Sequence, residues 1–126
     1  MTDSVHFSRI LLCSSDAIEE GGEVMPFDVV HDGEESRAFA ARFEGRVSAF
    51  LNRCTHVAME LDFQPNRIFD DSGQWLLCAS HGAVYHPESG ECMGGPCHGG
   101  LVRLQVEEED GQVYWIPDAH TQPSAD

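Results

Sequence analysis

Short alternating apolar runs separated by tight-turn signals are the feature that most limits the fold of this chain. The segment RAFAARF (37–43) alternates, Glu44-Gly45 supplies a turn, and RVSAFLNR (46–53) alternates again. Alternation with a period of two is typical of a strand with one buried face, and a two-residue turn ending in glycine joins two such strands into a hairpin. The pattern therefore predicts an antiparallel hairpin in the middle of the chain.

A second hairpin is predicted near the C-terminus. The segment GLVRLQVEEEDGQVYWIP (100–117) alternates on both sides of Asp110-Gly111. Further strand candidates are VMPFDVVHD, WLLCA and AVYHP, whereas residues 15–20 are the one candidate for a short helix. The fold class expected from these signals is all-β, with about eight to ten short strands.

The charge composition of the chain limits the kinds of molecule that it can bind. The 126 residues are enough for one domain, and 22 acidic against 7 basic side chains give a net charge of −15. Such a chain would be repelled by nucleic acid and by anionic membrane surfaces. The acidity either maintains solubility or attracts a basic protein partner, and the sequence leaves both interpretations open.

No secretion signal is expected at the N-terminus. Residues 1–16 lack the charged start and apolar core of a secretion signal, and the apolar run at 10–13 is far too short to span a bilayer. We therefore expect a cytoplasmic protein, with loose termini at 1–7 and 118–126. In that compartment five cysteines indicate metal ligands plus bystanders rather than a disulfide framework.

Two mixed cysteine–histidine pairs carry the chemistry. They are Cys54-Thr55-His56 and Cys78-Ala79-Ser80-His81. Zinc fingers usually group two cysteines together and two histidines together. Mixed pairs instead suit a site with two metal atoms, where each loop gives its cysteine to one atom and its histidine to the other.

At this point the sequence closely resembles the Rieske family, whose 2Fe-2S cluster has two histidines in place of two cysteines on one iron. The resemblance covers residues 8–117, with the cluster-binding part at about 52–98, and includes NRCTH, WLLCASHGAVY, HPESGEC and MGGPCHGGL. It implies a fold of antiparallel sheets with a small cluster-binding subdomain, formed by two ligand loops and a Gly-Pro loop. It also implies that Cys54 and Cys78 bind one iron and that His56 and His81 bind the other. Gly94, Gly95 and Pro96 would cover the cluster as a third wall.

The spacing departs from the family in one respect. Twenty-one residues separate His56 from Cys78, a longer interval than is typical of Rieske ferredoxins. We expect the extra length in FQPNRIFDDSGQW (63–75), which contains turn signals, and loop insertions cost little free energy. The alternatives to a cluster are a mononuclear zinc site and a coincidental set of cysteines and histidines.

Neighbouring residues bear on the reduction potential. Met59 and Ser80 stand where high-potential members of the family carry a disulfide, and Ala83 stands where they carry a serine that donates to the cluster. Both changes favour a potential in the lower half of the Rieske range of about −150 to +300 mV. Tyr85 either donates its hydroxyl to a ligand sulfur, which raises the potential, or is a core aromatic with its hydroxyl in solvent.

The remaining candidates are weaker. Cys92 and Cys97 flank the Gly-Pro loop as spare ligands, as a redox pair or, the interpretation we favour, as ordinary small side chains. His98 is expected to be solvated, and Cys13 to be a buried strand thiol. No partner is assigned to the other histidines, which are His6, His31, His86 and His120.

The function expected from the resemblance is a one-electron carrier, a soluble Rieske-type ferredoxin that passes electrons from a reductase to a terminal oxidoreductase such as an oxygenase. The sequence lacks the longer catalytic domain of Rieske oxygenases and any Gly-x-Gly-x-x-Gly fingerprint, so no enzyme activity of its own is expected. The alternatives are a fixed subunit of a larger oxidoreductase, resembling the nitrite reductase small subunit, and a non-redox zinc module.

Overall fold

A computed structural model describes residues 9–53, 60–61, 66–78, 82–97 and 99–124. These residues form ten strands and one turn of 3-10 helix at Ser15–Ala17. The strands are β1 Ile10–Ser14, β2 Met25–His31, β3 Glu34–Phe43, β4 Arg46–Leu51, β5 Leu76–Leu77, β6 Val84–Tyr85, β7 Cys92–Gly94, β8 Arg103–Glu109, β9 Gln112–Ile116 and β10 Thr121–Pro123. The all-β prediction is confirmed. None of the described segments is a helix long and apolar enough to cross a membrane.

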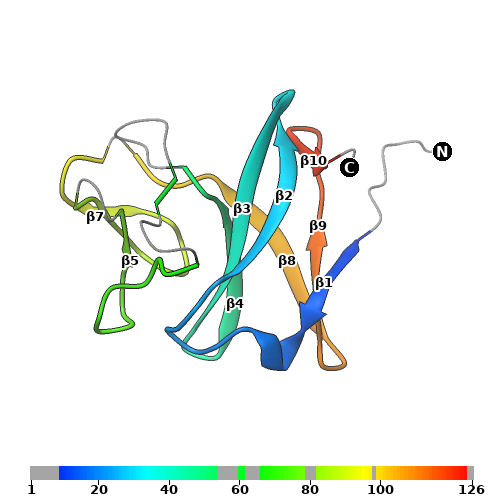
Figure 1. The fold of residues 1–126 in the computed structure, drawn as a ribbon, viewed down its shortest axis with the longest axis horizontal. Helices are drawn as coiled ribbons and strands as arrows, with labels where there is room; N and C mark the ends of the chain where they lie inside the picture. Colours follow the sequence, from blue (N-terminus) through cyan, green and yellow to red (C-terminus); the bar gives the residue numbers. More distant parts are fainter. Residues whose placement is uncertain (1–8, 54–59, 62–65, 79–81, 98, 125–126) are drawn as a thin grey trace.

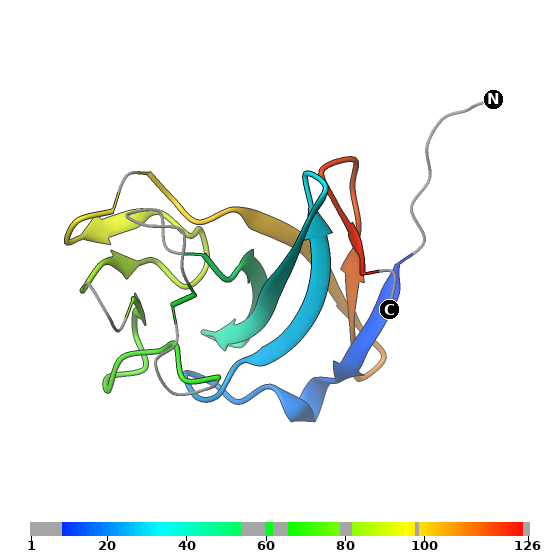
Figure 2. The same ribbon diagram turned by 45° about the horizontal axis from the view of Figure 1, so that its top comes forward.

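The strands form two antiparallel sheets (Figure 1). Seven strands make a large sheet in the order β1-β9-β8-β4-β3-β2-β10, and the other three make a small sheet in the order β5-β6-β7. The large sheet curls on itself, because the rings of Phe27 in β2 and Trp115 in β9 lie 5.2 Å apart although three strands separate these two in the sheet order. Strands β1, β9 and β10 lie on the side of the molecule away from the small sheet in both ribbon views (Figure 2).

Both predicted hairpins are present. β3 and β4 pair from Ala38↔Leu51 to Phe43↔Arg46, and β8 and β9 pair out to Glu109↔Gln112. Each turn is a two-residue loop with positive φ at both positions, 51° and 80° at Glu44-Gly45 and 53° and 76° at Asp110-Gly111. Such turns match the twist of the strands they join, which is why the sequence signal was specific.

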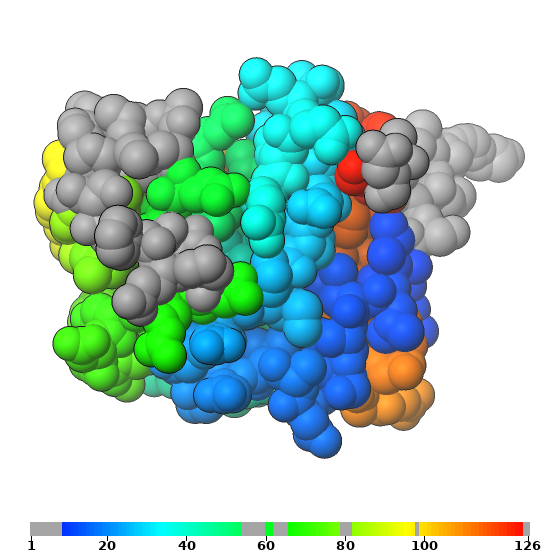
Figure 3. Space-filling model, in the orientation of Figure 1, coloured from blue at the N-terminus to red at the C-terminus, as the bar shows by residue number. Residues whose placement is uncertain are grey.

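β3 and β4 form a wall between two apolar cores. Alternate residues of β3 face opposite ways, so Ala38 and Ala40 line the interior of the large sheet while Phe39 and Ala41 face the small sheet. Phe50 of β4 joins Phe39 on the second face, with ring centroids 5.8 Å apart. In the space-filling view, the cyan band of β2 and β3 separates the green and yellow part of the chain from the blue and orange strands (Figure 3).

Arg42 fastens the helical turn and the β8–β9 hairpin to this wall. Its guanidinium donates to the carbonyl oxygens of Ser15, Ile18 and Gly45 at 2.9–3.1 Å. It also forms a two-point ion pair with Glu108, at 2.7 and 3.2 Å. The hydrogen bonds from Arg42 hold the pKa of the Glu108 carboxyl below its ordinary value.

Two expectations about individual segments are wrong. The helix predicted at 15–20 is only the 3-10 turn Ser15–Ala17. The C-terminal segment is not loose throughout, because β10 pairs with β2 and Thr121, 1% exposed, hydrogen bonds through Oγ1 to Nδ1 of His31 at 2.8 Å. The N-terminal segment 1–7 lies outside the described residues.

The insertion before Cys78 behaves as predicted where it is described. A turn at residues 70–73 is closed by the backbone nitrogen of Gly73, which donates to the carbonyl oxygen of Asp70 at 3.0 Å. The turn packs backbone against backbone on Gly21. The turn at 70–73 therefore lies beside Gly21, and Phe69 just before it pairs with Leu76 of β5.

Candidate metal centre

The structure describes the bases of the predicted ligand loops. Cys78 directly follows β5 and is fully buried in the apolar core between the two sheets. The other three predicted ligands, Cys54, His56 and His81, lie outside the described residues. The ligand set therefore stays a prediction, while the described residues show how each loop is held.

A side-chain amide closes the first ligand loop (residues 52–61). The Oδ1 of Asn52 accepts a 2.7 Å hydrogen bond from the backbone N–H of Leu61, which is 1% exposed. The backbone N–H of Asn52 donates to the carbonyl oxygen of Arg37 in β3 at 2.8 Å, so the same residue also ties the loop to the large sheet. Sequence reasoning missed Asn52, although a polar residue that continues the apolar strand β4 into the ligand motif was a usable signal.

Backbone hydrogen bonds close the second ligand loop (residues 78–83). The N–H of Cys78 donates to the carbonyl oxygen of Ala83 at 2.8 Å, and the N–H of Gly82 donates to the carbonyl oxygen of Cys78 at 2.8 Å. Both ends of the loop are fully buried at Cys78 and Ala83. The sulfur of Cys78 thus comes from a backbone that is fixed on both sides.

The Gly-Pro loop lies directly against the second ligand loop. We call residues 94–96 the cover loop. Gly95 has φ +77°, and a Cβ atom built there would lie 2.5 Å from the carbonyl oxygen of Gly82 and 2.9 Å from the Cα of Ala83. Only a residue without a side chain allows the two backbones to approach so closely. The contact falls one residue after His81.

A disulfide spans the cover loop. Cys92 and Cys97 are bonded to each other, with Cα atoms 6.0 Å apart. The favoured interpretation of these two cysteines as ordinary small side chains is wrong, as is the expectation that the five cysteines are only metal ligands and bystanders. The sequence spacing left pairing open because connectivity cannot be read from spacing alone. His98 lies outside the described residues.

Tyr85 is fully buried in the core that also contains Cys78. The interpretation that placed its hydroxyl in solvent is therefore wrong. Burial of a phenol normally requires a hydrogen-bond partner for the hydroxyl, which favours a role for Tyr85 beside the predicted centre. Cys13, in β1, is half-buried rather than buried, and burial raises the pKa of its thiol.

His86 has partners that the sequence did not predict. Its Nδ1 accepts the backbone N–H of Glu88 at 3.0 Å, and its ring contacts Phe43 and Trp75 edge to face, with centroids 5.7 and 6.1 Å away. These contacts fix the turn between β6 and β7. His31 and His120 also have partners, Thr121 and Asp32 respectively.

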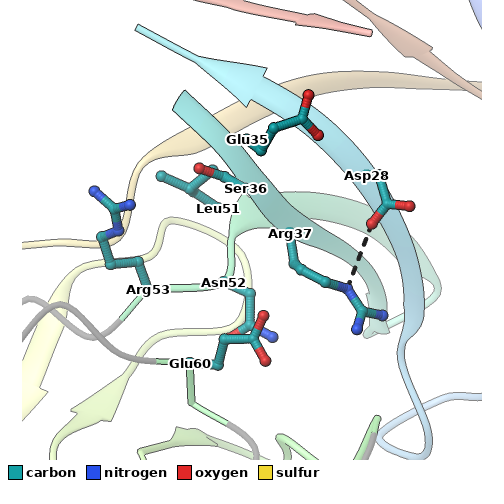
Figure 4. A pocket seen from close by; sticks show the side chains of 8 residues that line it. All are labelled: Asp28, Glu35, Ser36, Arg37, Leu51, Asn52, Arg53 and Glu60. Atoms are coloured by element: carbon teal, nitrogen blue, oxygen red, sulfur yellow. Dashed lines mark ion pairs between the residues drawn. The ribbon is translucent and has the colours of Figure 1, made fainter. Parts of the chain in front are cut away.

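A shallow groove of about 310 Å³ lies where β4 leads into the first ligand loop (Figure 4). It is lined by Asp28, Glu35, Ser36, Arg37, Leu51, Asn52, Arg53 and Glu60. Its arginines are paired, Arg37 with Asp28 at 3.6 Å and Arg53 with Glu34 at 3.2 Å. The approach to the first ligand loop is thus a polar surface of mixed charge.

Comparison with protein families decides the identity of the centre. The Rieske [2Fe-2S] domain model matches residues 8–123, which is most of the chain. The chain belongs to the Rieske [2Fe-2S] domain family. Members of this family hold a Rieske-type cluster, so the two mixed pairs, one with its buried Cys78, fit a cluster of this type. No curated protein was found to match the chain by sequence.

Solved structures share the Rieske fold. The ferredoxin of carbazole 1,9a-dioxygenase from Nocardioides aromaticivorans IC177 is 21% identical, with a TM-score of 0.70 over 88% of this chain and 99% of that one. The Sphingomonas yanoikuyae B1 ferredoxin is 22% identical, with a TM-score of 0.67 over 88% and 100%. The terminal oxygenase of the Nocardioides dioxygenase is 19% identical, with a TM-score of 0.67 over 95% of this chain but only 33% of its own.

Proposed function

We propose that this Rieske protein is a one-electron carrier that takes electrons from a reductase and delivers them to a terminal oxidoreductase such as an oxygenase. The observation that carries the proposal is the extent of the likeness: the chain matches a Rieske domain along nearly its whole length and spans whole ferredoxins, but only a third of an oxygenase. The cluster supplies a one-electron redox centre when bound. A Rieske domain of the same extent as these ferredoxins suits transfer of electrons.

In this proposal Cys54 and Cys78 hold one iron and His56 and His81 hold the other. Thiolates and imidazoles are the donor set of a Rieske centre. The described residues support it, because the buried base at Cys78 excludes water on one side and the cover loop lies against the backbone that follows His81. Neutral imidazoles keep the oxidised centre close to zero net charge, which favours acceptance of an electron.

Charge favours a basic partner. All seven basic residues of the chain are arginines, and five of them pair with carboxylates, namely Arg9, Arg37, Arg42, Arg46 and Arg53. A surface with this excess of carboxylates attracts a positively charged docking face and speeds encounter at low salt. One of the similar structures is a complex of a reduced oxygenase with its oxidised ferredoxin, which supports an oxygenase as the class of acceptor.

Spectroscopy on the purified protein tests the centre. We expect about two irons and two acid-labile sulfides per chain, and a Rieske-type electron paramagnetic resonance signal after reduction with dithionite. The Cys78→Ser variant should lose the signal. The Cys13→Ser variant, which changes a thiol in β1 of the large sheet, should keep it. A colourless protein that contains zinc would refute the carrier function.

A fixed subunit of a larger oxidoreductase is the second candidate, because the same fold occurs as one third of an oxygenase chain. Gel filtration of the native protein separates the two. A free small protein that is reduced by a ferredoxin reductase and supports turnover of an oxygenase is a carrier, whereas permanent co-elution with a larger partner identifies a subunit. Cytoplasmic location belongs to the same proposal and is checked by cell fractionation.

A further inference from the structure

The Cys92–Cys97 disulfide closes a short ring around the cover loop. The two cysteines are five positions apart, and residues 93–96 lie between them. Cys92 begins β7, and both cysteines pack against the core that contains Cys78, Ala83 and Tyr85. The disulfide therefore connects the two ends of the cover loop at the point where both ends contact the core.

The cover loop begins on the small sheet, because Gly94 ends β7 and pairs with Val84 of β6, whereas Gly95 and Pro96 lie beyond the strand. Two of the three residues of the cover loop are glycines, which lose more conformational freedom on ordering than any other residue. The neighbouring side chain of Met93 is 49% exposed, so it does not anchor the loop. A crosslink across such a segment removes much of the freedom it would have when open.

The ordered position brings the loop into close contact with the second ligand loop. The backbone of Gly95 approaches Gly82 and Ala83 so closely that a methyl group would not fit between them. Gly94 at the start of the loop pairs with Val84 of β6, and the contact made by Gly95 depends further on the segments before and after the loop staying together. The disulfide at residues 92 and 97 keeps them together.

We propose that Cys92 and Cys97 are a positioning pair, whose disulfide presses the cover loop onto residues 82–83 and so keeps water away from the cluster. This inference rests on the proposed function. Reduction of the cluster adds one negative charge, and water stabilises that charge better than a cover that excludes water. The closed loop therefore lowers the reduction potential and slows loss of the cluster.

The Cys92–Cys97 disulfide can also be reduced reversibly. A dithiol reductant cleaves the bond between the two sulfurs, the protein gains two electrons and two protons as two thiols, and the reductant becomes a disulfide. Cytosolic thiol systems carry out this exchange on accessible disulfides, and both cysteines here are only half-buried. Release of the bond frees the cover loop without any change in the predicted ligands.

The test compares the cluster-loaded protein with the double variant Cys92→Ser, Cys97→Ser and with Cys13→Ser as the matched control. Thiol titration of the unfolded, unreduced, cluster-free wild type should find three thiols of the five cysteines. In the double variant the potential should rise, and absorbance of the cluster should decay in the presence of a chelator about tenfold faster or more. Treatment of the wild type with dithiothreitol should reproduce both changes, and Cys13→Ser should match the wild type.

Dithiothreitol treatment keeps the test decisive if the double variant fails to fold. Five titratable thiols in the wild type would overturn the proposal, as would an unchanged potential and decay rate after the disulfide is reduced. Equal changes in Cys13→Ser would overturn it too, because the effect would then not belong to the cover loop. Absence of a Rieske signal from the wild type itself would instead refute the proposed function.

Discussion

The side-chain Oδ1 of Asn52 accepts a 2.7 Å hydrogen bond from the backbone N–H of Leu61, and this bond joins the described ends of the first ligand loop. The second ligand loop is closed by backbone hydrogen bonds from Cys78 to Ala83 and from Gly82 to Cys78, and the cover loop is closed by a disulfide. Three kinds of interaction thus close the bases of the three loops: a side-chain hydrogen bond, backbone hydrogen bonds and a disulfide. The Asn52 hydrogen bond and the disulfide can each be removed by substitution, whereas the backbone hydrogen bonds of the second loop cannot.

Replacement of Asn52 by leucine tests the first closure. The change keeps the branched shape of the side chain but leaves the buried N–H of Leu61 without its acceptor, which should lower the free energy of unfolding by about 1–3 kcal/mol. The cluster should also be lost faster. Denaturant unfolding and the decay of cluster absorbance measure the two effects. Asn52→Asp keeps an acceptor oxygen and should lose less of the cluster's lifetime than Asn52→Leu; equal lifetimes would contradict the role of the hydrogen bond.

Gly95→Ala tests the contact between the cover loop and the second ligand loop. An added Cβ would clash with the backbone of Gly82, so we expect a loss of about 3 kcal/mol or more in unfolding free energy, with faster cluster loss. Gly111→Ala is the control, because Gly111 has nearly the same φ, 76°, but open space where a Cβ would be. It should cost only about 1–2 kcal/mol, from the left-handed backbone alone, and leave the cluster unaffected.

Tyr85→Phe tests whether the buried hydroxyl acts on the cluster. If the hydroxyl donates to a ligand sulfur, as the family resemblance implies, its removal should lower the reduction potential with little change in the core. A redox titration followed by visible spectroscopy measures the shift. Tyr114→Phe is the control, because the Tyr114 hydroxyl donates to Gln112 in β9 at 2.6 Å. An identical potential in wild type and Tyr85→Phe would exclude the hydroxyl as a donor.

Glu108→Gln should reveal a pH-dependent contribution to stability. Because Arg42 holds the folded-state pKa of Glu108 below its ordinary value of 4.5, the ion pair stabilises the protein at pH above 4.5. That stabilisation is lost as the pH falls through the lowered folded pKa. At pH 7 the variant should be less stable by about 1 kcal/mol, and the difference should shrink toward zero in acid. Glu109→Gln, at a more exposed pair with Arg9, should show a smaller difference throughout.

The sequence predicted those parts of the fold that local chemistry determines. Glu44-Gly45 and Asp110-Gly111 each require positive φ at consecutive positions, and few structures other than a hairpin turn use such a pair. The residues that close the loops depend on contacts between distant segments. The partner of Asn52 lies nine positions away, and Cys92–Cys97 was one of several possible pairings, so neither could be derived from local pattern.

The prediction of a loose C-terminal segment was wrong for a related reason. TQP at 121–123 has the composition of a tail, and only its pairing with β2 makes it a strand. Tertiary contact here overrides local propensity. In the centre itself, coordination chemistry leads from the sequence to four predicted ligands, which stay a prediction, whereas the burial of Tyr85 required the assembled core.

The wall formed by β3 and β4 affects how the protein unfolds. Its alternate side chains belong to different cores, so a slip of one residue in the pairing would push Phe39 and Phe50 into space shaped for alanines. Neither core can be dismantled while the other keeps its shape. The two cores, and with them the small and the large sheet, should therefore melt in a single cooperative transition.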